Sequence, residues 1–263
     1  MTATADAVAD AAATSPLSRG PGLSPLADRD ELDYRERHES WPEPLRDVPA
    51  FVERKELVRK LEFALAQARL EPSGTVVELG AGTCWLAATL ASRSAVERVI
   101  AIEFSERRLV ELAPITIAAL DAPAAKVERR VADFYAHGLG ERVADWVFMD
   151  AAFHHAADPV ALARVAYELL RPGGRLVLTR EPTLSLLRRS RDHGEEDEHG
   201  SFEHEYDAAG YLRHLRAAGF IATKHPASGG WRTPRARALL RPPLAWMNGI
   251  LFSEYTYVGV RSS

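Results

Sequence analysis

The sequence predicts an α/β protein built on a doubly wound, mostly parallel sheet. Between residues 75 and 180, short apolar or β-branched runs alternate with segments of helical periodicity, which is typical of right-handed βαβ units. A glycine-rich turn follows the first apolar run. Ligands of such sheets lie beyond the carboxyl ends of the strands, so the residues that end each strand are the candidates for a functional site.

The apolar runs and their periodicity give the expected elements in order. Strands are expected at 75–79, 96–102, 127–131, 145–149, 176–178, 220–224 and 255–260. Amphipathic helices are expected at 48–70, 84–92, 105–119, 158–170 and 207–218. Pro114 lies inside the third helix, so a kink or break is expected there.

The chain divides into three parts by composition. Residues 1–28 are rich in Ala, Thr, Pro and Ser and lack the pattern of a secretory signal, so a disordered or weakly ordered tail is expected. Residues 29–70 are expected to form helices that cap the site. Residues 71–263 form the main domain, in which 183–206 and 229–252 are insertions on the substrate side.

Composition limits the classes of function. At 263 residues and 46% hydrophobic content the chain can bury a full core. Its net charge of -4 argues against nucleic acid as a partner, and no run of apolar residues is long enough for a membrane span. A single cysteine, Cys84, fits a reducing cytoplasm. A small-molecule substrate is expected, and the sequence allows a homodimer.

The glycine-rich turn carries the clearest ligand-binding signal. Gly80 and Gly82 follow the first strand, and the helix that begins near Thr83 would aim unpaired N–H groups at the turn. A dinucleotide-binding turn would have an apolar residue in place of Glu78 and a glycine in place of Trp85. An NAD-dependent dehydrogenase is therefore disfavoured.

The turn instead resembles motif I of the class I S-adenosylmethionine (SAM) dependent methyltransferases, with Cys84 in place of the last glycine of that motif. The segment from Asp150 to His155, followed later by Arg171-Pro172-Gly173-Gly174, resembles motif IV and its sequel in small-molecule members of that family. The resemblance implies SAM as cofactor and a Rossmann-like sheet of seven strands whose last strand is antiparallel.

The resemblance also implies which residues bind the cofactor. The amino-acid end would lie against Glu78, Gly80, Ala81 and Gly82, with Asp150 beside it. Glu103, which ends the second strand and precedes Phe104, would take the ribose hydroxyls, although a solvated acid is the ordinary alternative. Asp133 and Phe134 would contact the adenine, unless Asp133 is an ordinary helix cap and Phe134 a core residue.

Catalysis of methyl transfer requires alignment of the acceptor and, for a protonated acceptor, a base. His155 and His154 follow motif IV, and Glu181 ends the fifth strand, so these three residues are the catalytic candidates. A histidine that holds backbone and a satisfied loop acid remain alternatives. The candidate substrate contacts are Tyr34, Phe153, His204 and Tyr206.

No metal is expected. The loop 193–205 is dense in His, Glu and Asp, but it lacks a fixed ligand pair such as H-E-x-x-H and is expected to be solvated.

The leading functional prediction is transfer of the SAM methyl group to an oxygen, nitrogen or carbon of a small molecule, releasing S-adenosylhomocysteine. Two alternatives stay open. The first is a SAM-binding enzyme with non-methylating chemistry, such as an intramolecular cyclisation that releases methylthioadenosine. The second is a non-catalytic SAM-binding partner subunit.

Overall fold

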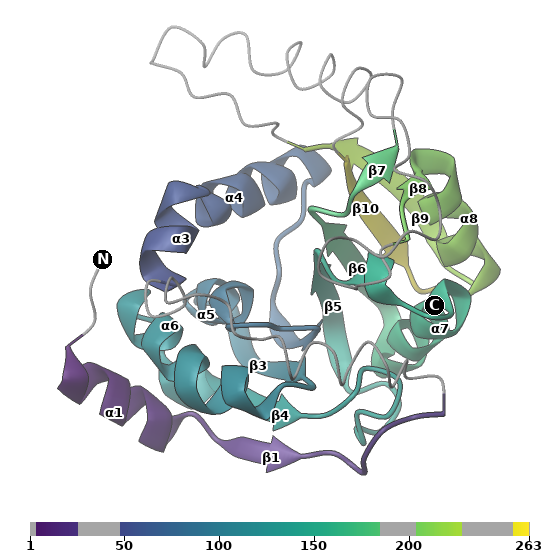
Figure 1. Ribbon diagram of the computed structural model, residues 1–263. Helices are drawn as coiled ribbons and strands as arrows, with labels where there is room; N and C mark the ends of the chain where they lie inside the picture. The colour runs from purple at the N-terminus through teal and green to yellow at the C-terminus, as the bar shows by residue number, and fades with distance from the viewer. Residues whose placement is uncertain (1–3, 26–47, 185–203, 228–254, 263) are drawn as a thin grey trace, which may run out of the picture.

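The computed structural model describes residues 4–25, 48–184, 204–227 and 255–262, and its centre is one eight-stranded sheet (Figure 1). The strands are, in their order across the sheet, β1 (Leu17–Arg19), β4 (Val127–Val131), β3 (Val96–Glu103), β2 (Gly74–Leu79), β5 (Ala144–Asp150), β6 (Leu170–Thr179), β10 (Tyr255–Val260) and β9 (Ile221–Pro226). The pairs from β1 to β6 are parallel, whereas β10 is antiparallel to both β6 and β9. The predicted mostly parallel sheet with an antiparallel last strand is confirmed.

Helices cover both faces of the sheet (Figure 1). They are α1 (Ala5–Thr14), α3 (Val48–Arg54), α4 (Leu57–Ala68), α5 (Trp85–Ala91), α6 (Ala113–Ala119), α7 (Pro159–Leu169) and α8 (Ala208–Ala217). Two adjacent residues of β2 show the arrangement: Val76 packs into the core beneath α4, α5 and α6, whereas Val77 packs into the core beneath α7 and α8. Both faces are buried, which explains why β2 and β5 read as nearly continuous apolar runs.

The N-terminal segment corrects one prediction. Residues 1–28 are expected to be a weakly ordered tail, but over 4–25 the structure shows helix α1 and strand β1, which pairs in parallel with β4 as the eighth strand of the sheet. Arg129 of β4, only 3% exposed, holds this segment by donating to the carbonyls of Ala12 and Ser15 and to that of Leu109. A buried guanidinium needs such acceptors, and here backbone carbonyls supply them.

Two predicted helices depart from a regular α-helix. The expected helix 48–70 is divided by Glu56, whose φ of 53° is left-handed, into α3 and α4. The helix predicted across Pro114 is π-helical over Arg108–Leu112 and continues as α6, with the proline in its first turn. A kink or break is expected at Pro114, but the chain stays helical through it, and the π-helical turn just before the proline accommodates its missing N–H.

The predicted caps and insertions are described only in part. Residues 26–47 lie outside the described residues, as do 185–203 and 228–254. The described ends of the first insertion form a small parallel sheet of β7 (Thr183–Leu184) and β8 (Tyr206–Asp207).

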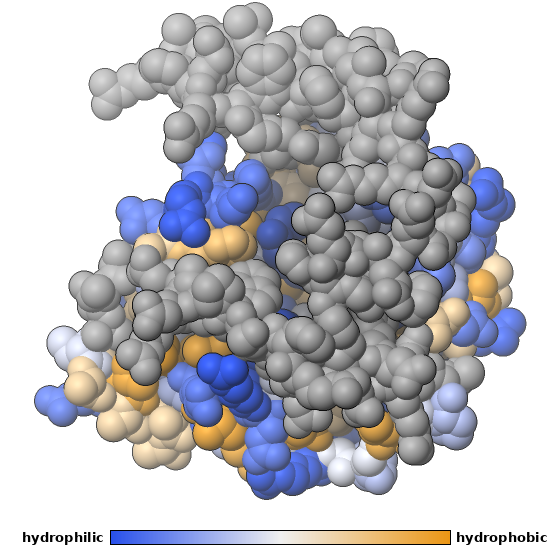
Figure 2. All heavy atoms as spheres, viewed as in Figure 1, coloured by the Kyte–Doolittle hydropathy of each residue, from blue (hydrophilic) through white to orange (hydrophobic). Residues whose placement is uncertain are grey.

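The described surface mixes polar and apolar side chains. Hydrophilic and hydrophobic residues are interspersed over the face shown in Figure 2, and large apolar side chains that are exposed include Leu17, Leu23, Val110 and Ile221. Within the described ranges, no helix is both long enough and apolar enough to cross a bilayer.

Candidate active site

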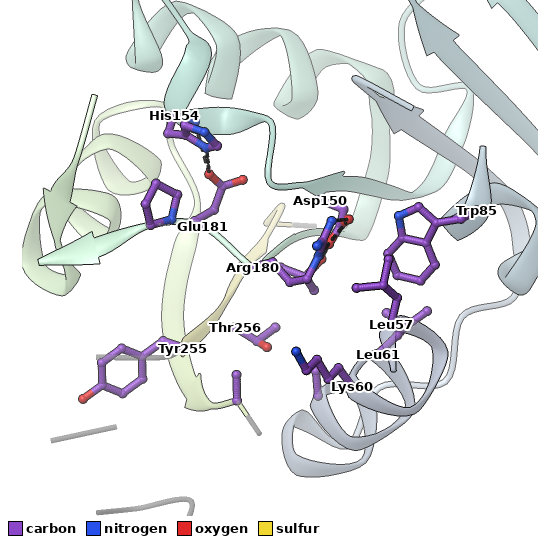
Figure 3. A pocket seen from close by; sticks show the side chains of 14 residues that line it. Leu57, Lys60, Leu61, Trp85, Asp150, His154, Arg180, Glu181, Tyr255 and Thr256 are labelled. Atoms are coloured by element: carbon purple, nitrogen blue, oxygen red, sulfur yellow. Dashed lines mark hydrogen bonds and ion pairs between the residues drawn. The ribbon is translucent and has the colours of Figure 1, made fainter. Parts of the chain in front are cut away.

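Two adjoining cavities lie where β2, β5 and β6 end. The first, of about 270 Å³, is the loop cavity, and its wall includes Glu78, Gly80, Ala81, Gly82, Thr83 and Arg108. The second, of about 420 Å³, is the helix cavity, and its wall includes Leu57, Lys60, Leu61, His154, Glu181 and Thr256 (Figure 3). Trp85, Asp150 and Arg180 line both cavities and therefore stand between them.

The glycine turn is shaped by backbone conformations that favour glycine. Gly80 has a φ of 76°, and a Cβ at this position would lie 2.7 Å from the Cβ of Ala152. The N–H groups of Gly80 and Ala81 donate to the carbonyl of Ile102, which ties the turn to β3. Any side chain at Gly80 would therefore push the turn away from the motif IV segment.

Cys84 occupies the last glycine position of the resembling motif and keeps a glycine-like conformation, with a φ of 62°. Its side chain is fully buried, and burial raises the pKa of the Cys84 thiol well above its usual value. A buried neutral thiol is a poor nucleophile, which agrees with the expectation that Cys84 packs rather than reacts.

Glu78 is the residue of the loop cavity that most needs a ligand. It is 1% exposed, and its Oε2 atom has no hydrogen-bond partner among the described residues. Burial, together with the negative charge of Asp150, raises the pKa of Glu78 well above its usual value. A cationic group placed in the loop cavity would satisfy this oxygen, so the residues present fit the ammonium of SAM.

Glu103 is tied to the same turn. Its Oε2 accepts from the N–H of Gly82 at 2.8 Å and its Oε1 accepts from that of Ser105 at 3.1 Å. Each carboxylate oxygen can accept a second bond, but Glu103 is buried and lines neither cavity, so its contact with the ribose stays a prediction.

The two residues expected at the adenine lie outside both cavities. The carboxylate of Asp133 accepts from the N–H groups of Ser24 and Tyr135, at 2.9 and 3.0 Å, and burial raises the pKa of Asp133. Phe134 is half-buried, with its ring edge-on to that of Tyr135 at 5.3 Å. Phe104 is likewise half-buried and lines neither cavity. The bond from Ser24 places the N-terminal segment beside this part of the sheet.

Arg180 was not among the site residues predicted from the sequence, yet it lies between the two cavities and lines both. Its Nε donates to Oδ1 of Asp150 at 2.8 Å and its second terminal nitrogen also contacts that carboxylate, while the guanidinium lies 5.6 Å from the ring centre of Trp85. Thr179 donates to the same carboxylate at 2.7 Å. The position of Arg180 directly after β6 could have identified it from the sequence, because the same criterion selected Glu181.

Glu181 and His154 form a dyad beside the helix cavity (Figure 3). The Glu181 carboxylate accepts from the N–H groups of Ala152, Phe153 and His154 at 3.0 to 3.1 Å and lies 2.8 Å from Nδ1 of His154. Because a carboxylate accepts rather than donates, a proton on Nδ1 of His154 satisfies this contact, and Nε2 is then the ring nitrogen that can accept a proton.

The two candidate histidines differ in position. His154 lines the helix cavity, whereas His155 lines neither cavity and packs its half-buried ring on that of His154, with 3.9 Å between the ring centres. Of the catalytic candidates, His154 faces the cavity and Glu181 orients it.

The expected substrate contacts divide in the same way. Phe153 is fully buried and packs against Tyr211 in the core, so it does not reach either cavity. His204 is exposed and its N–H donates to the carbonyl of His154, and Tyr206 stacks near it at 6.2 Å; neither lines the two cavities. Tyr34 lies outside the described residues.

Much of the charge-dense loop 193–205 also falls outside the described residues. In the part of the chain that the structure describes, no three His, Cys, Asp or Glu side chains gather as metal ligands would.

The fold and the glycine turn define a class of protein. Residues 77–178 match the family model described as a methyltransferase domain. Over this segment the chain matches a methyltransferase domain, and it has the fold of the class I SAM-dependent methyltransferases, as the resemblance implied.

Several solved structures are similar to the chain. A chain from the Haloferax volcanii complex between the Trm112 methyltransferase activator and a protein described as a methyltransferase is 20% identical, with a TM-score of 0.62 and coverage of 90% of this chain and 98% of that one. Haemonchus contortus phosphoethanolamine N-methyltransferase 2, solved with SAM, is 12% identical, with a TM-score of 0.57 and coverage of 88% and 60%. The [4+2]-cyclase SpnF is 16% identical, with a TM-score of 0.53 and coverage of 78% and 81%. No curated protein sequence matched the chain.

Proposed function

We propose that the protein binds SAM and transfers its methyl group to an oxygen, nitrogen or carbon atom of a small molecule, releasing S-adenosylhomocysteine. The proposal rests on the pair of adjoining cavities: one contains the buried Glu78, whose Oε2 has no hydrogen-bond partner among the described residues, and the other contains a histidine oriented by Glu181. A sulfonium methyl group bound between the cavities would supply the electrophile, and the protein would supply alignment and a base.

The loop cavity would hold the amino-acid end of the cofactor. Glu78 would bind the ammonium group, and Arg108, which lines the same cavity, would bind the carboxylate. Glu103, fixed by Gly82, would take the ribose hydroxyls. We assign the adenine to the surface near Asp133 and Phe134, which the resemblance indicates.

The helix cavity would hold the acceptor. His154 would accept the acceptor's proton at Nε2, and Glu181 would stabilise the resulting imidazolium through Nδ1. Asp150 would keep Arg180 in place at the partition.

A pair of adjacent variants tests this assignment. His154→Gln should lower kcat by about 100-fold, the usual contribution of a general base, while the SAM affinity measured by calorimetry stays unchanged. His155→Gln is the matched control and should keep most of the activity, because His155 lines neither cavity. A loss of rate in His155→Gln with normal rate in His154→Gln would reverse the assignment.

A non-methylating reaction is the second candidate function, because one of the similar structures is a [4+2]-cyclase. Incubation with SAM alone separates the two functions. Methylthioadenosine formed without an acceptor supports cyclisation, whereas S-adenosylhomocysteine formed only with an acceptor supports methyl transfer.

A partner-dependent or non-catalytic subunit is the third candidate, since one similar structure is a complex with an activator protein. The purified chain should turn over SAM by itself under our proposal. Activity that arises only after addition of a second protein would favour the partner role.

A further inference from the structure

The helix cavity is lined by a buried hydroxyl group, that of Thr256. Thr256 of β10 is 1% exposed and lines this cavity, and its Oγ1 atom makes no hydrogen bond with the described residues. A buried hydroxyl is normally satisfied. Figure 3 shows Thr256 with its hydroxyl on the same side of the cavity as Lys60. A polar group of a ligand placed there would form hydrogen bonds with both side chains.

Lys60 lies on the apolar face of its helix. Leu57, Lys60, Leu61 and Ala64 follow the i, i+3, i+4, i+7 spacing of one helical stripe, and all four line the helix cavity. Lysine is ordinarily directed to solvent from such a position. Lys60 is half-buried and lines the cavity, and none of the ion pairs among the described residues involves its ammonium. Within the described part of the chain, its charge therefore has no counter-ion at the cavity.

The cations of this cavity are accessible and its carboxylates are not. The Arg180 side chain is 34% exposed, whereas the side chains of Asp150 and Glu181 are 3% and 0% exposed. Both oxygens of each carboxylate already accept hydrogen bonds from the protein. A ligand in the cavity thus meets the ammonium of Lys60 and the remaining N–H groups of Arg180, whose Nε and Nη2 bind Asp150, beside the apolar side chains of Leu57 and Leu61.

We propose that the helix cavity selects an acceptor that carries a carboxylate, which Lys60, Arg180 and the Thr256 hydroxyl bind while Leu57 and Leu61 contact its apolar part. This inference rests on the proposed methyl transfer, because it names the class of acceptor. A carboxylate in this region could also belong to the amino-acid end of SAM. Lys60 and Thr256 line only the helix cavity, whereas Arg180 lines both, so Lys60 distinguishes the two sources.

Binding of a simple pair of probes tests the proposal without turnover. Benzoate and benzamide have the same shape and differ in charge, and their affinities are measured by calorimetry on the full chain saturated with S-adenosylhomocysteine. Benzoate should bind at least about 10-fold more tightly, as expected for a charge-assisted contact. Equal affinities for the two probes would overturn the proposal.

Two substitutions in α4 test whether Lys60 causes the preference for benzoate. Lys60→Met should abolish the preference for benzoate and leave the SAM affinity unchanged. Arg59→Met is the matched control, because Arg59 is exposed, pairs with Glu56 and does not line the cavity, so it removes the same charge while keeping the preference. Loss of SAM affinity in Lys60→Met would assign the carboxylate to the cofactor and overturn the proposal.

The failure of methyl transfer itself is a separate outcome. If benzoate is preferred and Lys60→Met removes that preference, but SAM is never converted to S-adenosylhomocysteine with any hydroxy or amino acid, then the carboxylate site stands and the proposed reaction fails. If S-adenosylhomocysteine forms equally well with acids and with their amides, the reaction stands and the carboxylate site fails.

Discussion

At the residue scale, Glu78 is the side chain whose chemistry depends most on the ligand. Its carboxylate is buried beside Asp150, so ionisation is unfavourable in the free protein. A cation in the loop cavity reverses this balance, because the ionised form then gains an ion pair. Binding of SAM should therefore be coupled to loss of a proton from Glu78.

The raised pKa of Glu78 makes the stability of the protein depend on pH in a defined direction. A raised folded-state pKa means that the native protein binds more protons than the unfolded chain, so this group's contribution to stability falls as pH rises from its ordinary value of 4.5 toward the folded-state pKa. Glu78→Gln, which has no charge, should be more stable than wild type at pH 8, and the difference should shrink toward pH 5. Thermal unfolding of both proteins without ligand measures this, and a constant difference across the range would contradict it.

The same variant should lose cofactor affinity. Glu78→Gln removes the charge that we assign to the SAM ammonium, and a weakening of at least about 10-fold is expected from the loss of a charge-assisted hydrogen bond. Calorimetric titration with SAM measures the change. Unchanged affinity would place the ammonium elsewhere.

At the element scale, the segment formed by α1 and β1 is attached through one buried side chain. Arg129→Met would leave the carbonyls of Ala12, Ser15 and Leu109 without the donors that they now have. The free energy of unfolding should fall by about 2–4 kcal/mol, the range for losing buried hydrogen bonds to a charged group. Urea denaturation measures the loss, and cleavage near Leu17 by a protease should accelerate. Wild-type stability would show that the segment contributes little.

The turn Phe153–His155 is likewise held by one buried side chain, that of Glu181, which follows β6. Glu181 accepts from three successive N–H groups of this turn as well as from His154. Glu181→Gln places an NH₂ group against backbone donors, so one of those bonds is lost. We expect a lower kcat at saturating SAM, because the amide cannot neutralise the charge that His154 gains when it accepts a proton from the acceptor. A wild-type kcat would limit Glu181 to a structural role.

At the scale of the whole molecule, the sequence predicted the sheet well because its strands are buried on both faces. The predicted strands 127–131 and 255–260 coincide with β4 and β10: β10 is a mostly apolar run, whereas β4 carries three charged residues between two valines. Strand β1 was missed because Leu17–Arg19 is short and largely exposed, and it is an edge strand that pairs with β4 alone among the described strands. Such a strand carries no local periodicity.

The candidate site was predictable as a set of strand ends but not as a set of contacts. Glu78, Gly80, Gly82 and Asp150 were placed in one cavity by motif order alone. The different positions of His154 and His155 depend on Glu181, which is 27 residues after His154 in the chain, and no local pattern reveals such a bond. The contact between Ser24 and Asp133 is equally long-range.

Methyl transfer requires the two cavities to act together, one on SAM and the other on the acceptor. The direct test is to incubate the purified protein with SAM labelled on its methyl group and a panel of hydroxy and amino carboxylic acids, and to analyse the products by mass spectrometry. We expect one labelled methyl group in the acceptor for each S-adenosylhomocysteine released, and a lower rate for His154→Gln. Methylthioadenosine formed from SAM alone, or SAM bound and never consumed, would contradict it.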